Sequence, residues 1–164
     1  MSGWGAPDTM TVDAAGLRLG LVATRWHAEL VDNMLDRARA AAKECGVTEV
    51  VEARVSGSVE LPVLAQALAR RCDAVVALGV VVRGDTAHFD YVCQAVTDGL
   101  TRVALDESTP VAHGVLTVDS VGQAKTAIAR YIDFYNTARP HSSLDKKTPD
   151  EFYFATLPAI KQAA

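Results

Sequence analysis

Three short polar stretches, each directly after an apolar run, carry the side chains that could do chemistry. Residues 24–27 contain Trp26, whose indole ring offers a flat apolar face on which a planar heterocycle can stack. Residues 56–60 supply backbone N–H groups and the carboxylate of Glu60 near the start of a predicted helix. These two stretches favour a site for a heterocyclic compound with polar substituents.

The third stretch, residues 83–88, favours phosphate binding and proton transfer. The sequence Gly84-Asp85-Thr86 leads into a predicted helix N-terminus, where free N–H groups and the helix dipole favour an anion such as phosphate. Alternatively, Asp85 or Thr86 only caps that helix. His88 stands in the first turn, and its imidazole suits general acid–base chemistry near neutral pH.

Other kinds of site lack their usual motifs. No two histidines are four residues apart and no cysteine pairs with one, so no metal site is predicted. The chain has no GxGxxG after its first predicted strand, no P-loop and no serine–histidine–acid set with supporting motifs. A single tryptophan after a strand more often packs than binds, and a single histidine at a helix start is more often a cap. The functional interpretation therefore depends on their joint placement.

Apolar runs alternate with helical patterns along most of the chain. Strands are expected at residues 17–23, 49–55, 74–82 and 100–105, and helices at 28–45, 61–71 and 86–97. Gly46 and Gly99 are expected to end the first and third helices. Residues 9–13 are expected to form an edge strand or an arm onto a neighbour. The alternation predicts a three-layer α/β/α fold with a four-stranded parallel sheet.

In such a sheet, ligands bind outside the carboxyl ends of the strands. The three polar stretches follow the first three predicted strands, and the loop after the fourth, residues 106–114, adds His113. Three of the four histidines and Trp26 are therefore expected at one edge of the sheet.

Composition indicates a globular protein of the cytoplasm. The net charge of −4 argues against nucleic acid or an anionic membrane as partner. The longest apolar runs, such as residues 74–82, are too short to span a bilayer. Residues 1–11 show no basic region followed by an apolar stretch, so no signal peptide is predicted. Cys45, Cys72 and Cys93 are expected to be buried free thiols in a reducing compartment.

Composition changes near residues 118–120. Six of the ten aromatic residues follow residue 130, and net charge is −5 over residues 1–118 but +1 over residues 119–164. This shift predicts two parts, a domain at 1–118 and a tail at 119–164.

The first part resembles the lumazine synthase family over about residues 14–117. The segments that carry the resemblance are LGLVATRWH (19–27), GSVELPVLAQ (57–66), ALGVVVRGDTAHFDYVCQAVTDGLTRVALD (77–106) and TPVAHGVLT (109–117). It is specific, because the RG-x-T-x-HF-x-YV and GVLT stretches occur in the family's order and spacing.

The resemblance implies an enzyme of riboflavin biosynthesis that uses no cofactor. It condenses 5-amino-6-(D-ribitylamino)uracil with 3,4-dihydroxy-2-butanone 4-phosphate to give 6,7-dimethyl-8-ribityllumazine, phosphate and water. The family forms pentamers, or shells of twelve pentamers, and two neighbouring subunits share each site. Riboflavin synthase is a further implied partner.

The resemblance also implies a role for each matching residue. On the uracil side it implies stacking by Trp26, ribityl contacts from Ser58, Val59 and Glu60, backbone contacts from Val80, Val81 and Val82, and a contact from His113 of the adjacent subunit. On the other side it implies that Asp85 and Thr86 contact the butanone phosphate and that His88 transfers protons.

The sequence departs from the family after Thr117. The family continues with an acidic helix, EQA-xx-R, whose arginine holds the phosphate; here Gln123 and Ala124 match, but Ala127 stands at the arginine position. The lysine-containing final helix of the family is not visible. Residues 119–154 instead resemble the C-terminal tail of insertion-sequence transposases with an integrase core, which implies a gene fusion. Alternatively, the tail is a helix at 121–136 with a loop-rich end that covers the sheet.

Three functions remain open from the sequence. The first is an active lumazine synthase, impaired by the replaced C-terminus. The second is an inactive assembly or ligand-binding remnant. The third, nucleic-acid binding through the tail, is disfavoured because the tail has no clustered basic face.

Overall fold

The computed structural model describes residues 12–137 and 147–156. Its elements in chain order are β1 (Arg18–Thr24), α1 (Ala28–Glu44), β2 (Glu49–Val55), the 3-10 turn η1 (Ser58–Glu60), α2 (Leu61–Ala69), β3 (Ala74–Val82), α3 (His88–Asp106), β4 (Val111–Val118), α4 (Val121–Thr137) and α5 (Pro149–Thr156). Of the expected edge strand or arm at residues 9–13, residues 9–11 lie outside the described part, and Val12 and Asp13 are not in a strand.

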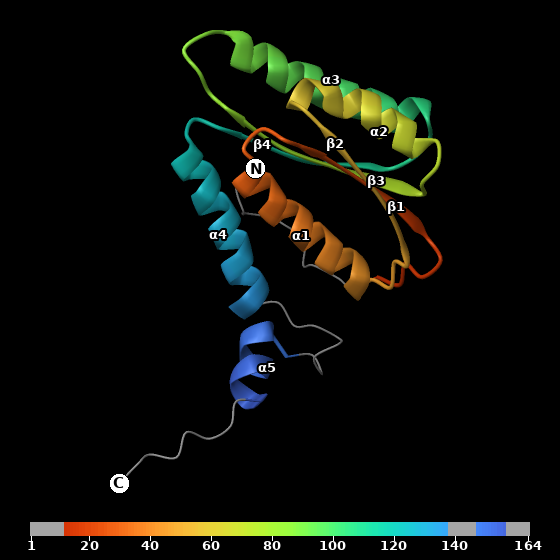
Figure 1. Ribbon diagram of the computed structural model, residues 1–164, viewed down its shortest axis with the longest axis vertical. Helices are drawn as coiled ribbons and strands as arrows, with labels where there is room; N and C mark the ends of the chain where they lie inside the picture. Colours follow the sequence, from red (N-terminus) through yellow and green to blue (C-terminus); the bar gives the residue numbers. More distant parts are fainter. Residues whose placement is uncertain (1–11, 138–146, 157–164) are drawn as a thin grey trace. The chain divides into compact units, whose positions relative to one another are not determined.

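The four strands form one parallel sheet in the order β2-β1-β3-β4. Helices α2 and α3 cover one face, and α1 with the first turns of α4 covers the other (Figure 1). The predicted three-layer α/β/α fold with a four-stranded parallel sheet is confirmed.

The central strand β3 explains why this architecture suits the sequence. Its side chains alternate between two cores: Val75 and Ala77 pack under α2 and α3, whereas Leu78 and Val80 pack under α1 and α4. A strand with both faces buried needs apolar residues at every position, which the run of valine and alanine supplies.

The prediction of a fourth strand at residues 100–105 is wrong. These residues are the last turns of α3, where Leu100 and Val103 point into the core one helical turn apart. Gly99 does not end the helix. A Cβ at Gly99 would lie 2.6 Å from Cγ of Pro62, so the glycine lets α3 pack closely against α2. The fourth strand is Val111–Val118 instead.

Other expected boundaries agree with the structure to within a few residues. Gly46 has a φ of +80° just after α1, a conformation that glycine adopts without strain. The helix expected at residues 121–136 is α4.

The chain divides into two compact units, residues 13–128 and residues 129–164 with 1–12. In the first unit, the start of α4 packs on the core through Ala124 and Ile128. In the second, α5 begins with a reciprocal cap: the Glu151 N–H donates to Thr148 Oγ1, and the Thr148 N–H donates to Glu151 Oε2. The compositional boundary near residues 118–120 stays a prediction.

Only one of the tail aromatics has a described side chain. Phe152 is 38% exposed. The side chains of the other five lie outside the described residues: Tyr131, Phe134, Tyr135, Tyr153 and Phe154.

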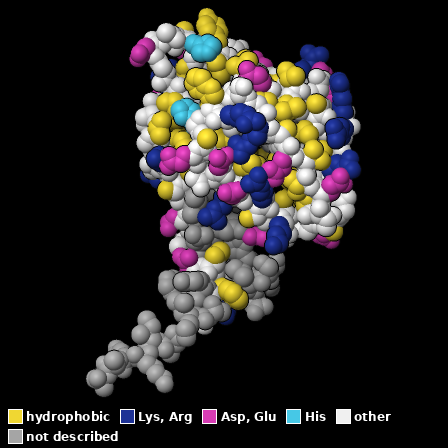
Figure 2. Space-filling model, in the orientation of Figure 1, with side chains coloured by type: hydrophobic (Ala, Val, Ile, Leu, Met, Phe, Trp, Pro, Cys, Tyr) yellow, Lys and Arg dark blue, Asp and Glu magenta, His cyan; other side chains and the backbone are white. Residues whose placement is uncertain are grey.

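All three cysteines are free, but only one is buried. Cys72 is buried as expected, whereas Cys45 and Cys93 are half-buried. Burial raises the pKa of the Cys72 and Cys93 thiols, which favours their protonated, unreactive form. Within the part of the chain that the structure describes, no helix has the length and apolar character needed to cross a membrane. On the face shown in Figure 2, acidic and basic side chains are interspersed.

Candidate active site

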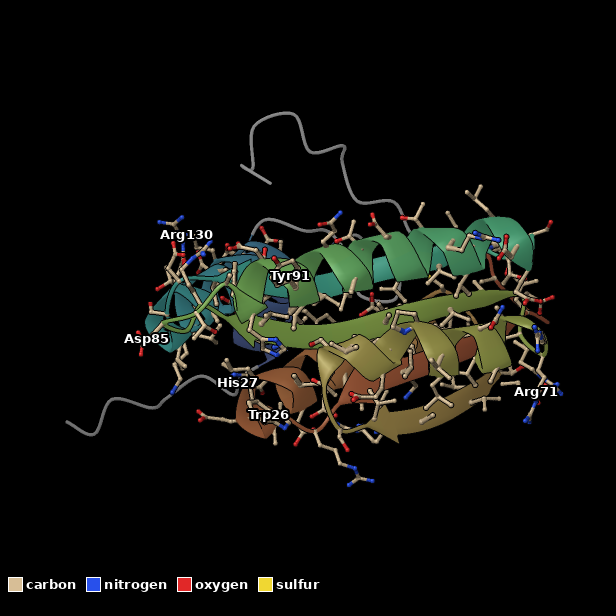
Figure 3. All side chains as sticks on the ribbon, turned by 90° about the horizontal axis from the view of Figure 1, so that it is seen from above. Trp26, His27, Arg71, Asp85, Tyr91 and Arg130 are labelled. Atoms are coloured by element: carbon tan, nitrogen blue, oxygen red, sulfur yellow. The ribbon has the colours of Figure 1, made fainter. Side chains whose placement is uncertain are left out.

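A cleft of about 370 Å³ lies at the carboxyl ends of β1, β2 and β3. The loops after these strands and the first turns of α3 form its walls. Its lining residues are Trp26, His27, Ser56, Gly57, Ser58, Val59, Glu60, Val80, Val81, Val82, Gly84, Thr86, His88, Phe89 and Val92. Figure 3 shows Trp26, His27 and Asp85 at one end of the sheet and Arg71 at the opposite end.

Backbone hydrogen bonds join the loops after β1 and β2. The Arg25 N–H donates to the carbonyl of Val55 at 2.8 Å, and the Trp26 N–H donates to that of Ser56 at 3.2 Å. Below them, the buried Thr24 hydroxyl donates to the Trp26 carbonyl. Both the N–H and the carbonyl of Trp26 are therefore fixed by hydrogen bonds.

Trp26 is largely exposed to solvent, so its ring is accessible to a ligand. The residue is 69% exposed, and its ring meets that of His27 edge-on, with centroids 6.5 Å apart and planes at 76°. His27 has a φ of +54°, the left-handed region that is unfavourable for a residue with a Cβ. This sharp turn starts α1 directly after the tryptophan and places both rings at the cleft.

The Gly57–Glu60 loop is folded against β3. The Gly57 N–H donates to Glu60 Oε2 at 2.7 Å, so the carboxylate closes its own loop. Ser58 is buried, and a Cβ at Gly79 would lie 3.1 Å from its hydroxyl oxygen. The absence of a side chain at Gly79 therefore lets this loop approach the strand and line the cleft beside Val80.

The loop between β3 and α3 brings His88 to the cleft. Helix α3 begins at His88, and the His88 N–H donates to Thr86 Oγ1 at 3.4 Å. The N-cap position is Ala87, and no side chain caps the helix there, so the capping alternative for Asp85 or Thr86 is wrong. The imidazole of His88 is exposed to solvent and lines the cleft together with Gly84 and Phe89.

Most of the predicted site residues meet in this one cleft. It contains Trp26, Ser58, Val59, Glu60, Val80, Val81, Val82, Thr86 and His88. Asp85 is exposed in the same loop but does not line the cleft. The expectation that His113 lies at the carboxyl edge of the sheet is wrong. His113 is the third residue of β4, opposite Ala77 in the middle of β3, because the fourth strand begins later than predicted.

Sequence reasoning did not assign a site role to His27, Phe89 or Val92. His27 was visible as the neighbour of Trp26, but nothing in the sequence showed its left-handed conformation. Phe89 and Val92 stand three residues apart on α3, so the helix presents both on one face. With the start of the helix known, this spacing predicts that Phe89 and Val92 lie on the same side of α3.

The described lining of the cleft has one acidic side chain and two histidines. Its titratable lining side chains are His27, Glu60 and His88, and among the described residues that line it none is Lys or Arg. A phosphate in this cleft would be met by backbone N–H groups near Thr86, without a cation from the lining of the same chain.

Comparison with known proteins agrees with this geometry. The sequence profile described as 6,7-dimethyl-8-ribityllumazine synthase matches residues 16–138, which is more than half of the chain. The chain belongs to the lumazine synthase family. The match extends beyond Thr117, where the sequence resemblance stopped, and includes all of α4.

Relatives named 6,7-dimethyl-8-ribityllumazine synthase are closely similar to this lumazine synthase family member. The protein of Salinispora arenicola is 71% identical over 125 residues, which cover 76% of this chain and 75% of that protein. The protein of Thermobifida fusca is 62% identical over 125 residues, covering 76% and 73%. The protein of Frankia casuarinae is 53% identical over 165 residues, covering 100% and 94%, so that alignment includes residues 119–164.

Proposed function

We propose that this protein is an active 6,7-dimethyl-8-ribityllumazine synthase, a transferase of riboflavin biosynthesis. It condenses 5-amino-6-(D-ribitylamino)uracil with 3,4-dihydroxy-2-butanone 4-phosphate to give the lumazine, phosphate and water. The observation that carries the proposal is the convergence of Trp26, the Gly57–Glu60 loop and His88 on one cleft from three separate segments. The family membership of the chain supports it.

Each wall of the cleft has a role in this reaction. The exposed face of Trp26 stacks on the uracil, and Ser58, Val59 and Glu60 bind the ribityl chain. Backbone groups of Val80, Val81 and Val82 line the pyrimidine pocket. Asp85 and Thr86, in the loop before α3, contact the phosphate of the second substrate through backbone N–H groups.

Most of the rate enhancement comes from orientation. Two substrates held in one cleft react as if they were a single molecule, which removes much of the entropic barrier. Condensation of an amine with a ketone releases water, and loss of phosphate also moves protons. His88, exposed at the cleft beside the phosphate loop, transfers them.

The proposal includes assembly and location. The protein forms a homo-oligomer, a pentamer or a shell of twelve pentamers, in the cytoplasm, with riboflavin synthase as a further partner. In this assembly His113 of one subunit contacts the uracil bound by its neighbour. An exposed side chain on β4 suits such a contact, because it is accessible to a second subunit. The origin of residues 119–154 in a transposase-like tail, acquired by gene fusion, stays a prediction, and the family match to residue 138 overlaps its first part.

A lumazine-formation assay on the purified full chain tests the function. Both substrates are supplied, product is followed by its absorbance and fluorescence, and light scattering gives the size in solution. We expect enzyme-dependent product above the spontaneous reaction and a homo-oligomer. A product rate equal to that without protein, from a sample of the expected assembly size, would instead indicate the inactive ligand-binding remnant.

Because no Lys or Arg is among the described residues that line the cleft, Ala127 becomes the subject of a prediction. Ala127 is exposed on α4, three residues after the buried Ala124, at the position of the family's phosphate-binding arginine. We expect Ala127→Arg to lower the KM for the butanone phosphate about ten- to a hundredfold, since a charge-assisted hydrogen bond contributes about 1.5–3 kcal/mol. The KM for the uracil substrate should not change.

The matched control is Ala129→Arg, which adds the same charge at another exposed position of α4. Steady-state kinetics with each substrate varied in turn provide both constants. Equal KM values for the phosphate substrate in Ala127→Arg and Ala129→Arg would show that α4 does not reach the phosphate of any subunit.

A further inference from the structure

The side chain of Arg83, the first residue after β3, contacts Asp119, Asp90 and Phe89. Its Nε donates to Asp119 Oδ1 at 2.9 Å, and its Nη1 lies 3.4 Å from Asp90 Oδ1. Its guanidinium carbon stands 4.1 Å from the centre of the Phe89 ring. One side chain thus joins the end of β3, the first turn of α3 and the residue that follows β4.

The contacts on α3 are next to the proposed proton-transfer residue. Phe89 and Asp90 directly follow His88, and Phe89 itself lines the cleft. A planar guanidinium can bond a carboxylate and stack on a ring at the same time. Arg83 therefore restrains two consecutive residues of the helical turn that presents His88.

Asp119, the other carboxylate that Arg83 contacts, is held in place by further hydrogen bonds. The Asp119 N–H donates to Gln123 Oε1 at 2.7 Å, and the Gln123 N–H donates to Ser120 Oγ at 3.2 Å. The backbone N–H of Arg83 donates to the carbonyl of Val118 at 2.8 Å. Contacts therefore run without interruption from the first turn of α4, through Asp119 and Arg83, to the start of α3.

Arg83 is close to the phosphate loop in sequence, but its charge is already matched. The guanidinium contacts two carboxylates and an aromatic face, although the side chain is 47% exposed, and Arg83 is not among the residues that line the cleft. These contacts favour a structural role for Arg83 at the start of α3 over a role as a phosphate-binding cation.

We propose that Arg83 is a positioning residue for the condensation, which holds His88 in register with the cleft through Phe89, Asp90 and Asp119. The inference rests on the proposed function. Exposed ion pairs contribute little to global stability, so loss of Arg83 should affect the reaction more than the fold. A small displacement of a catalytic group can slow a reaction strongly, because catalysis depends on near-attack geometry.

The decisive experiment combines Arg83→Ala with His88→Ala. In the wild-type background we expect Arg83→Ala to lower kcat about tenfold, with little change in the KM of either substrate. In the His88→Ala background, Arg83→Ala should cause no further loss, because the residue that it positions is gone. Asp119→Asn should give a smaller loss in the same direction. Arg83→Lys should not restore the rate, since an ammonium cannot keep the fork and the stacking contact together.

Arg102→Ala is the matched control. Arg102 lies on α3. Like Arg83 it pairs with an aspartate, Asp106, but at the end of the helix far from the cleft. It should leave kcat unchanged. A general weakening of the fold would lower the rate by the same factor in both backgrounds, which would overturn the inference. A selective rise in the KM for the butanone phosphate would also overturn it, because Arg83 would then be a ligand.

A second readout does not depend on turnover. In protein labelled with ¹³C at histidine, the His88 ring signal is assigned by its loss in His88→Ala. It should shift in Arg83→Ala and Asp119→Asn but not in Arg102→Ala. An unshifted signal overturns the role of Arg83. Absence of lumazine formation by the wild-type protein is a separate result, which would contradict the proposed function.

Discussion

His88→Ala should lower kcat about a hundredfold, at the lower end of the range for general acid–base catalysis, because orientation in the cleft supplies most of the rate. The substitution removes the imidazole that lines the cleft at the start of α3. His88 is exposed, so no core contact is lost and the melting temperature should not change. Single-turnover kinetics with both substrates saturating give the rate of the chemical step.

His113→Ala serves as the comparison, because it removes an exposed histidine outside this chain's cleft. It should act on the KM for the uracil substrate, through the neighbouring subunit's site, and should not reproduce the fall in kcat. Light scattering confirms that both variants keep the wild-type assembly. A His88→Ala enzyme with the wild-type kcat would show that solvent carries the protons.

Trp26→Ala should weaken binding of the ribitylaminouracil and of the lumazine product about ten- to a hundredfold. Stacking of a base on an aromatic ring contributes about 1–3 kcal/mol, and Trp26 lines the cleft, is exposed and is not part of the core. Titration calorimetry with the product measures the loss directly. The free energy of unfolding should be unaffected, because the loop is held by the backbone bonds of Arg25 and Trp26.

Trp26→Phe is the conservative partner of this variant. A phenyl ring keeps a flat face of smaller area, so most of the affinity should return. The KM for the butanone phosphate should be nearly the same in all three proteins. If Trp26→Ala and the wild type bound the product with equal affinity, the uracil would not stack on Trp26.

Local pattern and topology together predicted the layout of the site from the sequence. The first three strands and the helices between them have unambiguous periodicity, and the all-apolar run at residues 74–82 required a strand with two buried faces. Parallel strands end at a common edge, so Trp26, Glu60 and His88 had to converge once the strands were known.

The fourth strand and the restraints around His88 were decided only by tertiary contacts. The apolar spacing of residues 100–105 fits a short strand or a helix equally well, and Gly99 suggested a stop. The helix continues because Leu100 and Val103 pack into the core on one of its faces. Gly99 is compatible with the helix because Pro62 of α2 occupies the space where a side chain at Gly99 would lie. Arg83, Asp90 and Asp119 are likewise ordinary surface charges in the sequence. They form one cluster only because β3 and β4 end side by side, a pairing of residues far apart in the chain that no local pattern encodes.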